Sequence, residues 1–237
     1  MEKQKLLPDK ARVLSGSALK VIAVLTMLID HVGSHLIDRS IVLCSLAGHK
    51  IYLFQLMRMV GRMAFPLFCF LLVEGFIYTH SRLKYGINLF AFALISEIPW
   101  NLEHCGRLLN YRTQNVFFTL LFGFLAMCAV EYLKKVPVAM IAAILVAAFA
   151  SKLLKFDFGL VGVVFIVLLY ALREHEVLRI PAIFVLHRPW TSMLAFIPIS
   201  LYNGKRGFIK GKILKYAFYA FYPAHIFVIY LIKYHVI

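Results

Sequence analysis

The chain lacks the short motifs of the common soluble enzymes. Its 237 residues contain no G-x-S-x-G nucleophile elbow, no Walker phosphate-binding loop and no H-E-x-x-H zinc motif. The four cysteines show neither C-x-x-C spacing nor the neighbouring histidines of a zinc site. A metal site made from His31, His225, Asp30 and Glu97 would lack any short ligand spacing, so we predict no metal.

Acidic residues are scarce, with 11 Asp and Glu against 26 Lys and Arg and a net charge of +15. In a soluble protein this balance would suggest a nucleic-acid partner. However, 62% of the residues are hydrophobic and the mean hydropathy is +0.82, whereas soluble domains are about 45–50% apolar. The basic residues gather between apolar runs, where they set topology and meet anionic lipid headgroups. We therefore predict a membrane protein whose partner is the lipid bilayer, with no nucleic-acid partner.

The length suits one all-α, polytopic transmembrane helix bundle of about eight spans, with seven to nine possible. Residues 1–17 are polar and basic and are expected to form a cytoplasmic tail, whereas residues 18–237 form a single transmembrane domain. Most apolar runs approach the roughly 20 residues that cross a bilayer core. The expected spans are residues 18–37, 60–79, 86–104, 114–132, 137–151, 158–173, 180–202 and 216–233. The seventh is interrupted by His187-Arg188-Pro189 and is predicted to be broken or partly re-entrant.

Unusual polar residues fall toward one end of the predicted bundle, opposite the N-terminus. If successive spans alternate in direction, seven of the eight bring such residues to this end, and we expect the functional site there. They are Asp30 and His31 in span one, Arg58 and Arg62 in span two, Glu97 and Asn101 in span three, Asn115 in span four, Asp157 before span six, Asn203 to Arg206 after span seven, and His225 in span eight.

Asp30 and His31 are the strongest candidates. Ionisable residues are costly at membrane depth and tend to face a bundle interior or a water-filled cavity. An imidazole there can take or give a proton near neutral pH. Adjacent helical residues point about 100° apart, so we expect Glu97 to orient His31, or Asp30 to meet an arginine instead. Lys20 shares a helix face with His31, roughly 16 Å away, which suits a long anionic ligand threaded into the membrane. The alternative is a structural histidine.

Arg58 and Arg62 lie four residues apart on one helix face. Their guanidiniums suit a phosphate, a carboxylate or Asp30, and interfacial anchoring is the alternative. Glu97 precedes Pro99, and a proline bend in a membrane helix often lines a cavity.

Two further polar residues lie beside apolar runs. Asp157 is near the expected start of a helix, where capping is the expected role. His225 adds a second imidazole just after a proline.

Seven motifs, in order over about residues 18–233, resemble the TraX family. They are Lys20 to His31, Arg58 to Gly75, Ser96-Glu97-Ile98-Pro99, Asn115 to Thr119, Asp157-Phe158-Gly159, Leu201 to Gly207, and Phe221-Tyr222-Pro223-Ala224-His225. The family is named for a conjugative-pilus enzyme associated with N-terminal acetylation of pilin. It resembles, more distantly, the acyltransferase-3 membrane acyltransferases, in which an Arg, ten residues and a His on the first span mark the acyl-CoA site. Lys20 and His31 take these positions here, and Lys keeps the charge but loses the bidentate fork.

The resemblance implies a multi-pass acyltransferase of the bacterial cytoplasmic membrane that moves an acetyl or other short acyl group from acyl-CoA to a hydroxyl or amine. Acetyl-CoA is the expected co-substrate, and the acceptor is a protein amine, a glycan or a lipid headgroup. His31, oriented by Glu97 or Asp30, is the expected base. The expected CoA-binding residues are Lys20, Arg58, Arg62, Lys205 and Arg206, and the expected acceptor-binding residues are Asn115, Asn203, His225 and Asp157.

Two other classes of function use the same residues. A proton-coupled transporter or lipid-binding membrane protein would use Asp30, His31 and Glu97 as a proton relay. An assembly subunit of a secretion complex would tolerate substitution of His31. Acyl transfer predicts CoA binding, whereas transport predicts proton-coupled flux without chemistry.

Overall fold

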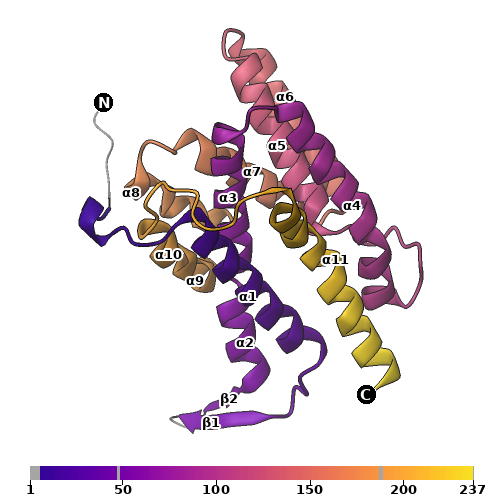
Figure 1. The fold of residues 1–237 in the computed structure, drawn as a ribbon. Coiled ribbons are helices and arrows are strands. Elements are labelled where there is room, and N and C mark those ends of the chain that lie inside the picture. Colours follow the sequence, from indigo (N-terminus) through magenta and orange to yellow (C-terminus); the bar gives the residue numbers. More distant parts are fainter. Residues whose placement is uncertain (1–5, 47–48, 187–188, 237) are drawn as a thin grey trace. The chain divides into compact units, whose positions relative to one another are not determined.

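The computed structural model describes residues 6–46, 49–186 and 189–236, and most of them are helical (Figure 1). The helical class predicted from the sequence is therefore confirmed. The described chain divides into two compact units. Residues 7–68 and 189–236 form one, called here the terminal unit, and residues 69–186 with Leu6 form the other, called the central unit.

The terminal unit is built around α1, which packs along α2 and α11. Its elements are α1 (Gly16–His35), β1 (Val42–Leu46), β2 (His49–Tyr52), α2 (Leu53–Gly61), the first turn of α3 (Ala64–Tyr78), α9 (Pro189–Ser192), α10 (Phe196–Ser200) and α11 (Lys212–His235). Ser15 starts α1, because its extended backbone lets its side chain accept a hydrogen bond from the Ala18 N–H at 3.3 Å.

Two glycines let α1 and α2 approach closely. A Cβ built on Gly33 would lie 2.6 Å from the Met57 Cβ, and one built on Gly61 would overlap the Asp30 side chain. Small residues at a helix interface allow the backbones to come together, as is common between membrane helices. The sequence therefore holds Asp30 directly against the end of α2.

A hairpin follows α1, in the interval between the first and second expected spans. β1 and β2 pair antiparallel, with Ser45 opposite Lys50 and Leu46 opposite His49, and Figure 1 shows the hairpin beyond the ends of α1 and α2. The strands are four and five residues long, too short for their alternation to identify them from the sequence. α2 then begins at Leu53, seven residues before the expected start of span two.

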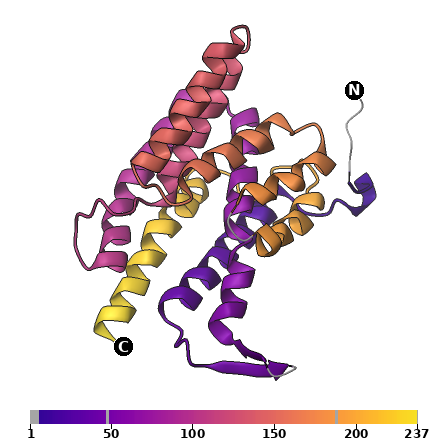
Figure 2. The ribbon, with the colours of Figure 1, turned by 180° about the vertical axis from the view of Figure 1, so that it is seen from behind.

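In the central unit, α5 packs against three other helices. The unit's helices are the rest of α3, α4 (Arg82–Cys105), α5 (Val116–Tyr132), α6 (Pro137–Leu153), α7 (Gly159–Ala171) and α8 (Glu176–Arg179). The partners of α5 are α4, α6 and α7, and two opposite views show these helices side by side (Figure 2). Ala126, Ala148 and Val163 meet in the core of this unit, and a Cβ on Gly123 would overlap Ile166.

These central helices match the expected spans three to six to within a few residues. α4 continues through Pro99 and ends where Gly106 adopts a left-handed conformation with φ 63°, the usual role of a glycine after a helix. Pro99 therefore lies inside the helix and does not end it.

Two helical stretches among the described residues are long and apolar enough to cross a membrane: Gly16–His35, and Leu53–Tyr78, which joins α2 and α3. α5, α6, α7 and the stretch Trp190–Ser200 are apolar but shorter. The prediction of eight spans is therefore not confirmed. The expected seventh span forms only short helical pieces, as predicted for a broken span. His187 and Arg188, where the interruption was placed, lie outside the described residues.

Candidate functional site

Asp30 and Arg58 form an ion pair between α1 and α2. The Nη1 of Arg58 lies 2.6 Å from the Oδ2 of Asp30, and both side chains are largely covered. Arg62, one turn after Arg58, also lies near enough for its charge to act on Asp30. The sequence left open whether Asp30 meets an arginine or orients His31. The geometry shows that Asp30 pairs with Arg58.

His31 meets the second imidazole of the predicted site, His225 of α11. The Nδ1 of His31 lies 2.6 Å from the Nε2 of His225, and the ring planes differ by only 10°. Parallel rings with nitrogen atoms this close cannot be stacked face to face, since carbon atoms in contact need about 3.5–4.0 Å. The two rings therefore meet edge to edge, with a hydrogen bond lying in the ring planes.

A backbone carbonyl fixes the direction of this hydrogen bond. The Nδ1 of His225 lies 2.8 Å from the carbonyl oxygen of Phe221, one turn earlier in α11, and a carbonyl only accepts. In neutral His225, Nδ1 therefore carries the proton and Nε2 is an acceptor. His31 must then donate from Nδ1, and the lone pair of its neutral ring is on Nε2. This is the tautomer of a base held by an orienting partner.

Aromatic rings surround the two histidines. The Tyr222 ring stands edge-on to His31 and His225, with centroids 6.3 and 5.6 Å away, and His35 lies one turn beyond His31. His225 is only 6% exposed. The His225 side of the pair is therefore buried among aromatic rings, whereas His31 is only half-buried.

The opposite end of α1 is capped by the loop before α11. The carbonyl groups of Lys205 and Arg206 accept hydrogen bonds from the Gly16 and Ser17 N–H groups at 2.8 and 2.9 Å. The Ser17 hydroxyl donates to the Arg206 carbonyl at 2.8 Å and accepts from the Ile209 N–H at 2.7 Å. These contacts satisfy N–H groups that a helix start leaves without intrahelical partners.

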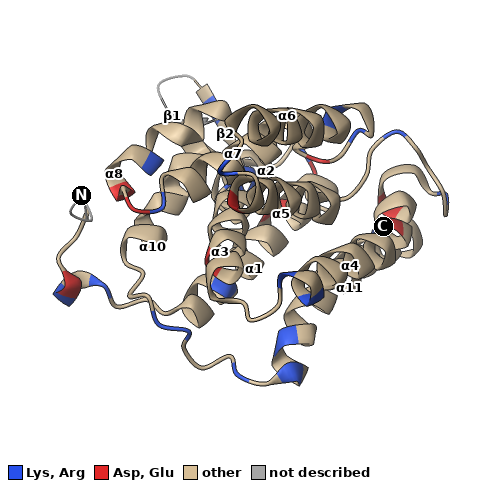
Figure 3. Cartoon of the chain, turned by 90° about the horizontal axis from the view of Figure 1, so that it is seen from above, with Lys and Arg blue, Asp and Glu red and all other residues tan. Residues whose placement is uncertain are grey.

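Cations gather at this capped end. Lys20, one turn into α1, lies within electrostatic range of Arg206 and Lys215. Figure 3 shows basic residues along the loop between α10 and α11 and into the first turns of α11. A cationic cluster therefore lies at one end of α1, and the histidine pair lies near the other.

This placement corrects part of the predicted gathering. Asn203, Lys205 and Arg206 were expected beside His31, but the Asn203 N–H donates to the Leu14 carbonyl, at the start of α1. Gly16 and His31 are fifteen residues apart, which is about 22 Å along a helix. The alternating-span argument failed here because the expected seventh span is not one continuous helix.

Glu97 and Asn115 are bonded to one another within the central unit. The buried Asn115 side chain donates to the Glu97 Oε2 at 2.6 Å and to the Ala93 carbonyl at 2.8 Å. Its Oδ1 accepts from the Phe117 N–H at 3.1 Å, so Asn115 is the N-cap of α5. These contacts give both residues a structural role, and the predicted action of Glu97 on His31 stays a prediction.

Asp157 also holds the central unit together. Its Oδ1 accepts from the Phe158 N–H at 3.1 Å, its own N–H donates to the Gln114 carbonyl, and its carbonyl accepts from Thr119. It thus precedes the N-cap residue of α7, Phe158, and does not cap the helix itself as expected.

Sequence reasoning missed two features of these sites. His225 was assigned to the acceptor, because no spacing shows that residues 194 positions apart share a hydrogen bond. Glu103 was not singled out, although it is only 1% exposed and its Oε2 lies 2.8 Å from the Nδ1 of His104. A carboxylate near the end of an expected span was the only signal for Glu103.

Comparison with known proteins places the chain in a family. The model of the TraX protein family matches residues 15–233. A relative from Dichelobacter nodosus is described as the probable fimbrial assembly protein FimC, serogroup H1. It is 30% identical over an alignment 241 residues long, and this alignment covers 90% of this chain and 93% of the relative. No solved structure matches the chain. The match over nearly the whole length shows that the chain belongs to the TraX family.

Proposed function

We propose that this protein is a multi-pass acyltransferase of the bacterial cytoplasmic membrane, which transfers an acetyl or other short acyl group from acyl-CoA to a hydroxyl or amine. The observation that carries the proposal is the His31–His225 pair, whose hydrogen bonds put the lone pair of His31 on Nε2. In this arrangement α4, α11 and the shorter apolar helices cross the bilayer together with the two longer stretches.

The cationic cluster fits the phosphates of CoA. Lys20, Arg206 and Lys215 put positive charge at one end of α1, and ammonium and guanidinium groups bind phosphate well. Lys20 and His31 share a face of α1 roughly 16 Å apart. A ligand whose phosphates lie at Lys20 can run along this face, and it would bring an activated thioester carbonyl to His31.

His31 acts as the general base in this proposal. Its Nε2 takes the proton of the acceptor hydroxyl or amine as the new bond to the acyl carbon forms, and the proton then passes to the sulfur as the carbon–sulfur bond breaks. His225 holds the ring of His31 through Nδ1, so Nε2 keeps its lone pair and its direction. Arg58, engaged by Asp30, keeps α1 and α2 together beside this base.

The acceptor belongs, in this proposal, to a surface fibre. The relative from Dichelobacter nodosus is described as a probable fimbrial assembly protein. A fimbrial or pilus component that presents an amine or hydroxyl at the membrane fits both this description and a base that needs an acceptor proton.

Binding and turnover test the two ends of α1 separately. The protein in nanodiscs is titrated with acetyl-CoA by calorimetry, and release of labelled acetyl is followed. We expect Lys20→Ala to weaken binding about tenfold, and Lys135→Ala, an exposed lysine of the central unit, to leave it unchanged. His31→Ala should keep binding but lose about 10²–10⁴-fold in turnover.

The orienting role of His225 has its own variants. His225→Ala should lower turnover without weakening CoA binding. His225→Gln should restore part of it, because its amide oxygen can accept from the His31 Nδ1. Absence of binding at millimolar acetyl-CoA would refute the proposal. Proton flux without CoA binding would favour a transporter. Normal fibre assembly in cells that carry His31→Ala, without acyl transfer, would favour an assembly subunit.

A further inference from the structure

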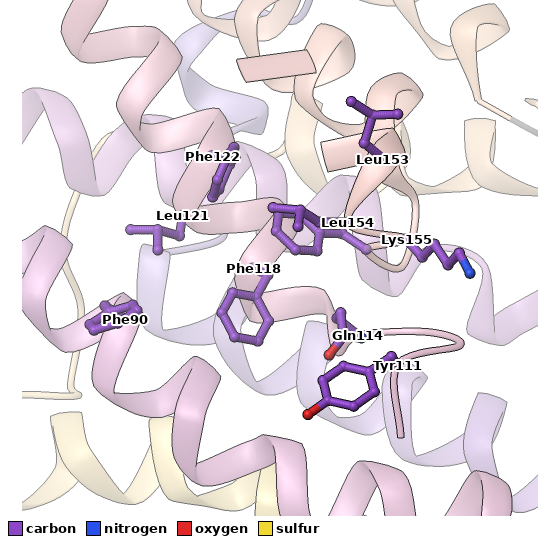
Figure 4. A pocket seen from close by; sticks show the side chains of 10 residues that line it. Phe90, Tyr111, Gln114, Phe118, Leu121, Phe122, Leu153, Leu154 and Lys155 are labelled. Atoms are coloured by element: carbon purple, nitrogen blue, oxygen red, sulfur yellow. The ribbon is translucent and has the colours of Figure 1, made fainter. Parts of the chain in front are cut away.

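A pocket in the central unit lies apart from the features described so far. Its volume is about 490 Å³, within the roughly 300–1,000 Å³ of ligand-binding pockets. It is lined by Phe90, Tyr111, Gln114, Phe118, Leu121, Phe122, Leu153, Leu154, Lys155 and Phe156. Most of these side chains are apolar, and Figure 4 shows the polar ones, Tyr111, Gln114 and Lys155, on one side.

An aromatic wall makes the inner surface of the pocket. Phe156 is 8% exposed, and its ring lies 5.2 Å from the Phe118 centroid and 4.9 Å from the Phe122 centroid. The outer rim is apolar as well, since Leu153 and Leu154 are 78% and 52% exposed. An apolar interior that continues into an exposed apolar rim suits a hydrocarbon chain entering from lipid.

The polar side is held in place by the backbone. The Gln114 N–H donates to the Lys155 carbonyl at 2.9 Å, and the Asp157 N–H donates to the Gln114 carbonyl at 2.8 Å. Lys155 has φ 58°, a conformation that is uncommon without glycine, and its side chain points outward from the aromatic rings of the pocket (Figure 4). Lys152 is in the last turn of α6, three residues before Lys155, and Arg112 is in the loop that bears Tyr111.

We propose that this pocket binds one acyl chain of an anionic membrane phospholipid, with Lys155 beside the phosphate. The apolar wall matches the chain and the cation matches the headgroup. Basic side chains near the ends of membrane helices extend to headgroup depth, where such a phosphate lies. The inference shares with the proposed function only the placement of α5 and α6 in the bilayer, and it does not depend on acyl transfer.

Native mass spectrometry of the full-length protein in detergent tests this site, with phosphatidylglycerol, phosphatidylcholine and oleate added in turn. Lys155→Gln should weaken phosphatidylglycerol binding three- to tenfold and leave phosphatidylcholine binding unchanged. Leu154→Trp should fill the rim and weaken binding of both phospholipids. The matched controls are Lys135→Gln and Leu145→Trp, because Leu145 is 51% exposed on α6, the helix that ends just before Leu154, and does not line the pocket.

Each result decides for or against the lipid site. Tighter binding of phosphatidylglycerol than of phosphatidylcholine, lost in Lys155→Gln and retained in both controls, supports it. Equal binding of the two phospholipids would overturn it. Phospholipid binding by Leu154→Trp as tight as that by Leu145→Trp would overturn it too. Oleate bound more tightly than phosphatidylglycerol would also overturn it, because the ligand would then be a free fatty acid.

Discussion

Replacing Asp30 by asparagine and Arg58 by methionine, singly and together, measures the free energy of the ion pair between α1 and α2. Asparagine keeps the shape of Asp30 without its charge, and methionine keeps much of the length of Arg58. Each single variant leaves one group without its partner, and the double variant removes both charges. The coupling free energy is the difference between the double change and the sum of the single changes.

The expected size follows from distance and exposure. Two unit charges about 4 Å apart attract by roughly 1 kcal/mol in water and roughly 4 kcal/mol at an effective dielectric constant of 20. The side chains of Arg58 and Asp30 are 27% and 15% exposed, so solvent screens the pair only in part. We expect a coupling free energy of about 2 kcal/mol. Each single variant should cost about 2–3 kcal/mol, because it leaves a largely buried charge or dipole unmatched.

Thermal unfolding of the four proteins in one detergent gives the cycle. A loss of 1 kcal/mol lowers the midpoint by about 2–4 °C for a chain of this size. The double variant should therefore unfold close to either single variant. Additive losses, with a coupling below about 0.5 kcal/mol, would refute the view that Asp30 serves to bind Arg58.

Substitutions at three further positions test the packing and the caps. Gly61→Ala should destabilise the protein by about 1–3 kcal/mol, because the new methyl group overlaps Asp30, and an unchanged thermal midpoint would contradict the close packing of α1 and α2. Asn115→Ala should cost about 1–2 kcal/mol through loss of the α5 cap, measured by the same unfolding assay. Asn115→Ser should recover part of this loss, because its hydroxyl can still accept from the Phe117 N–H, and equal losses in the two variants would contradict the capping role. Ser17→Ala should cost about 1–3 kcal/mol, since the buried Ile209 N–H loses its acceptor, and faster hydrogen exchange at Ile209 is the direct measurement.

Local patterns of the sequence predicted most helices, but not how the polar residues combine. The apolar runs gave α5 and α6 nearly to the residue, because each is a continuous apolar stretch ended by polar or turn residues. The hairpin after α1 was not predicted, because strands this short show little alternation of apolar and polar residues. Eleven-residue spacing placed Lys20 and His31 on one face of α1, which the helix permits.

Long-range pairing set the limit of the sequence prediction. From the sequence, Asp30 could pair with an arginine or orient His31. The close packing of α1 on α2 at Gly61 places it against Arg58. The partner of His31 is His225, 194 positions later in the chain. The tautomers of the two rings depend on the carbonyl group of Phe221. No pattern within a window of the sequence contains this information.

The hydrogen bonds that close the start of α1 impose an order on biosynthesis. Ser17 and Ile209 are 192 residues apart, and a ribosome that adds about 5–20 residues per second needs roughly 10–40 s to make the chain between them. By the end of this interval the ribosome has made every described helix of the central unit. α1 therefore waits longest for the loop that bonds its first N–H groups, and the two imidazoles meet only once α11 has been made. The hydrogen bond between His31 and His225 can therefore form only in a chain that is almost fully synthesised.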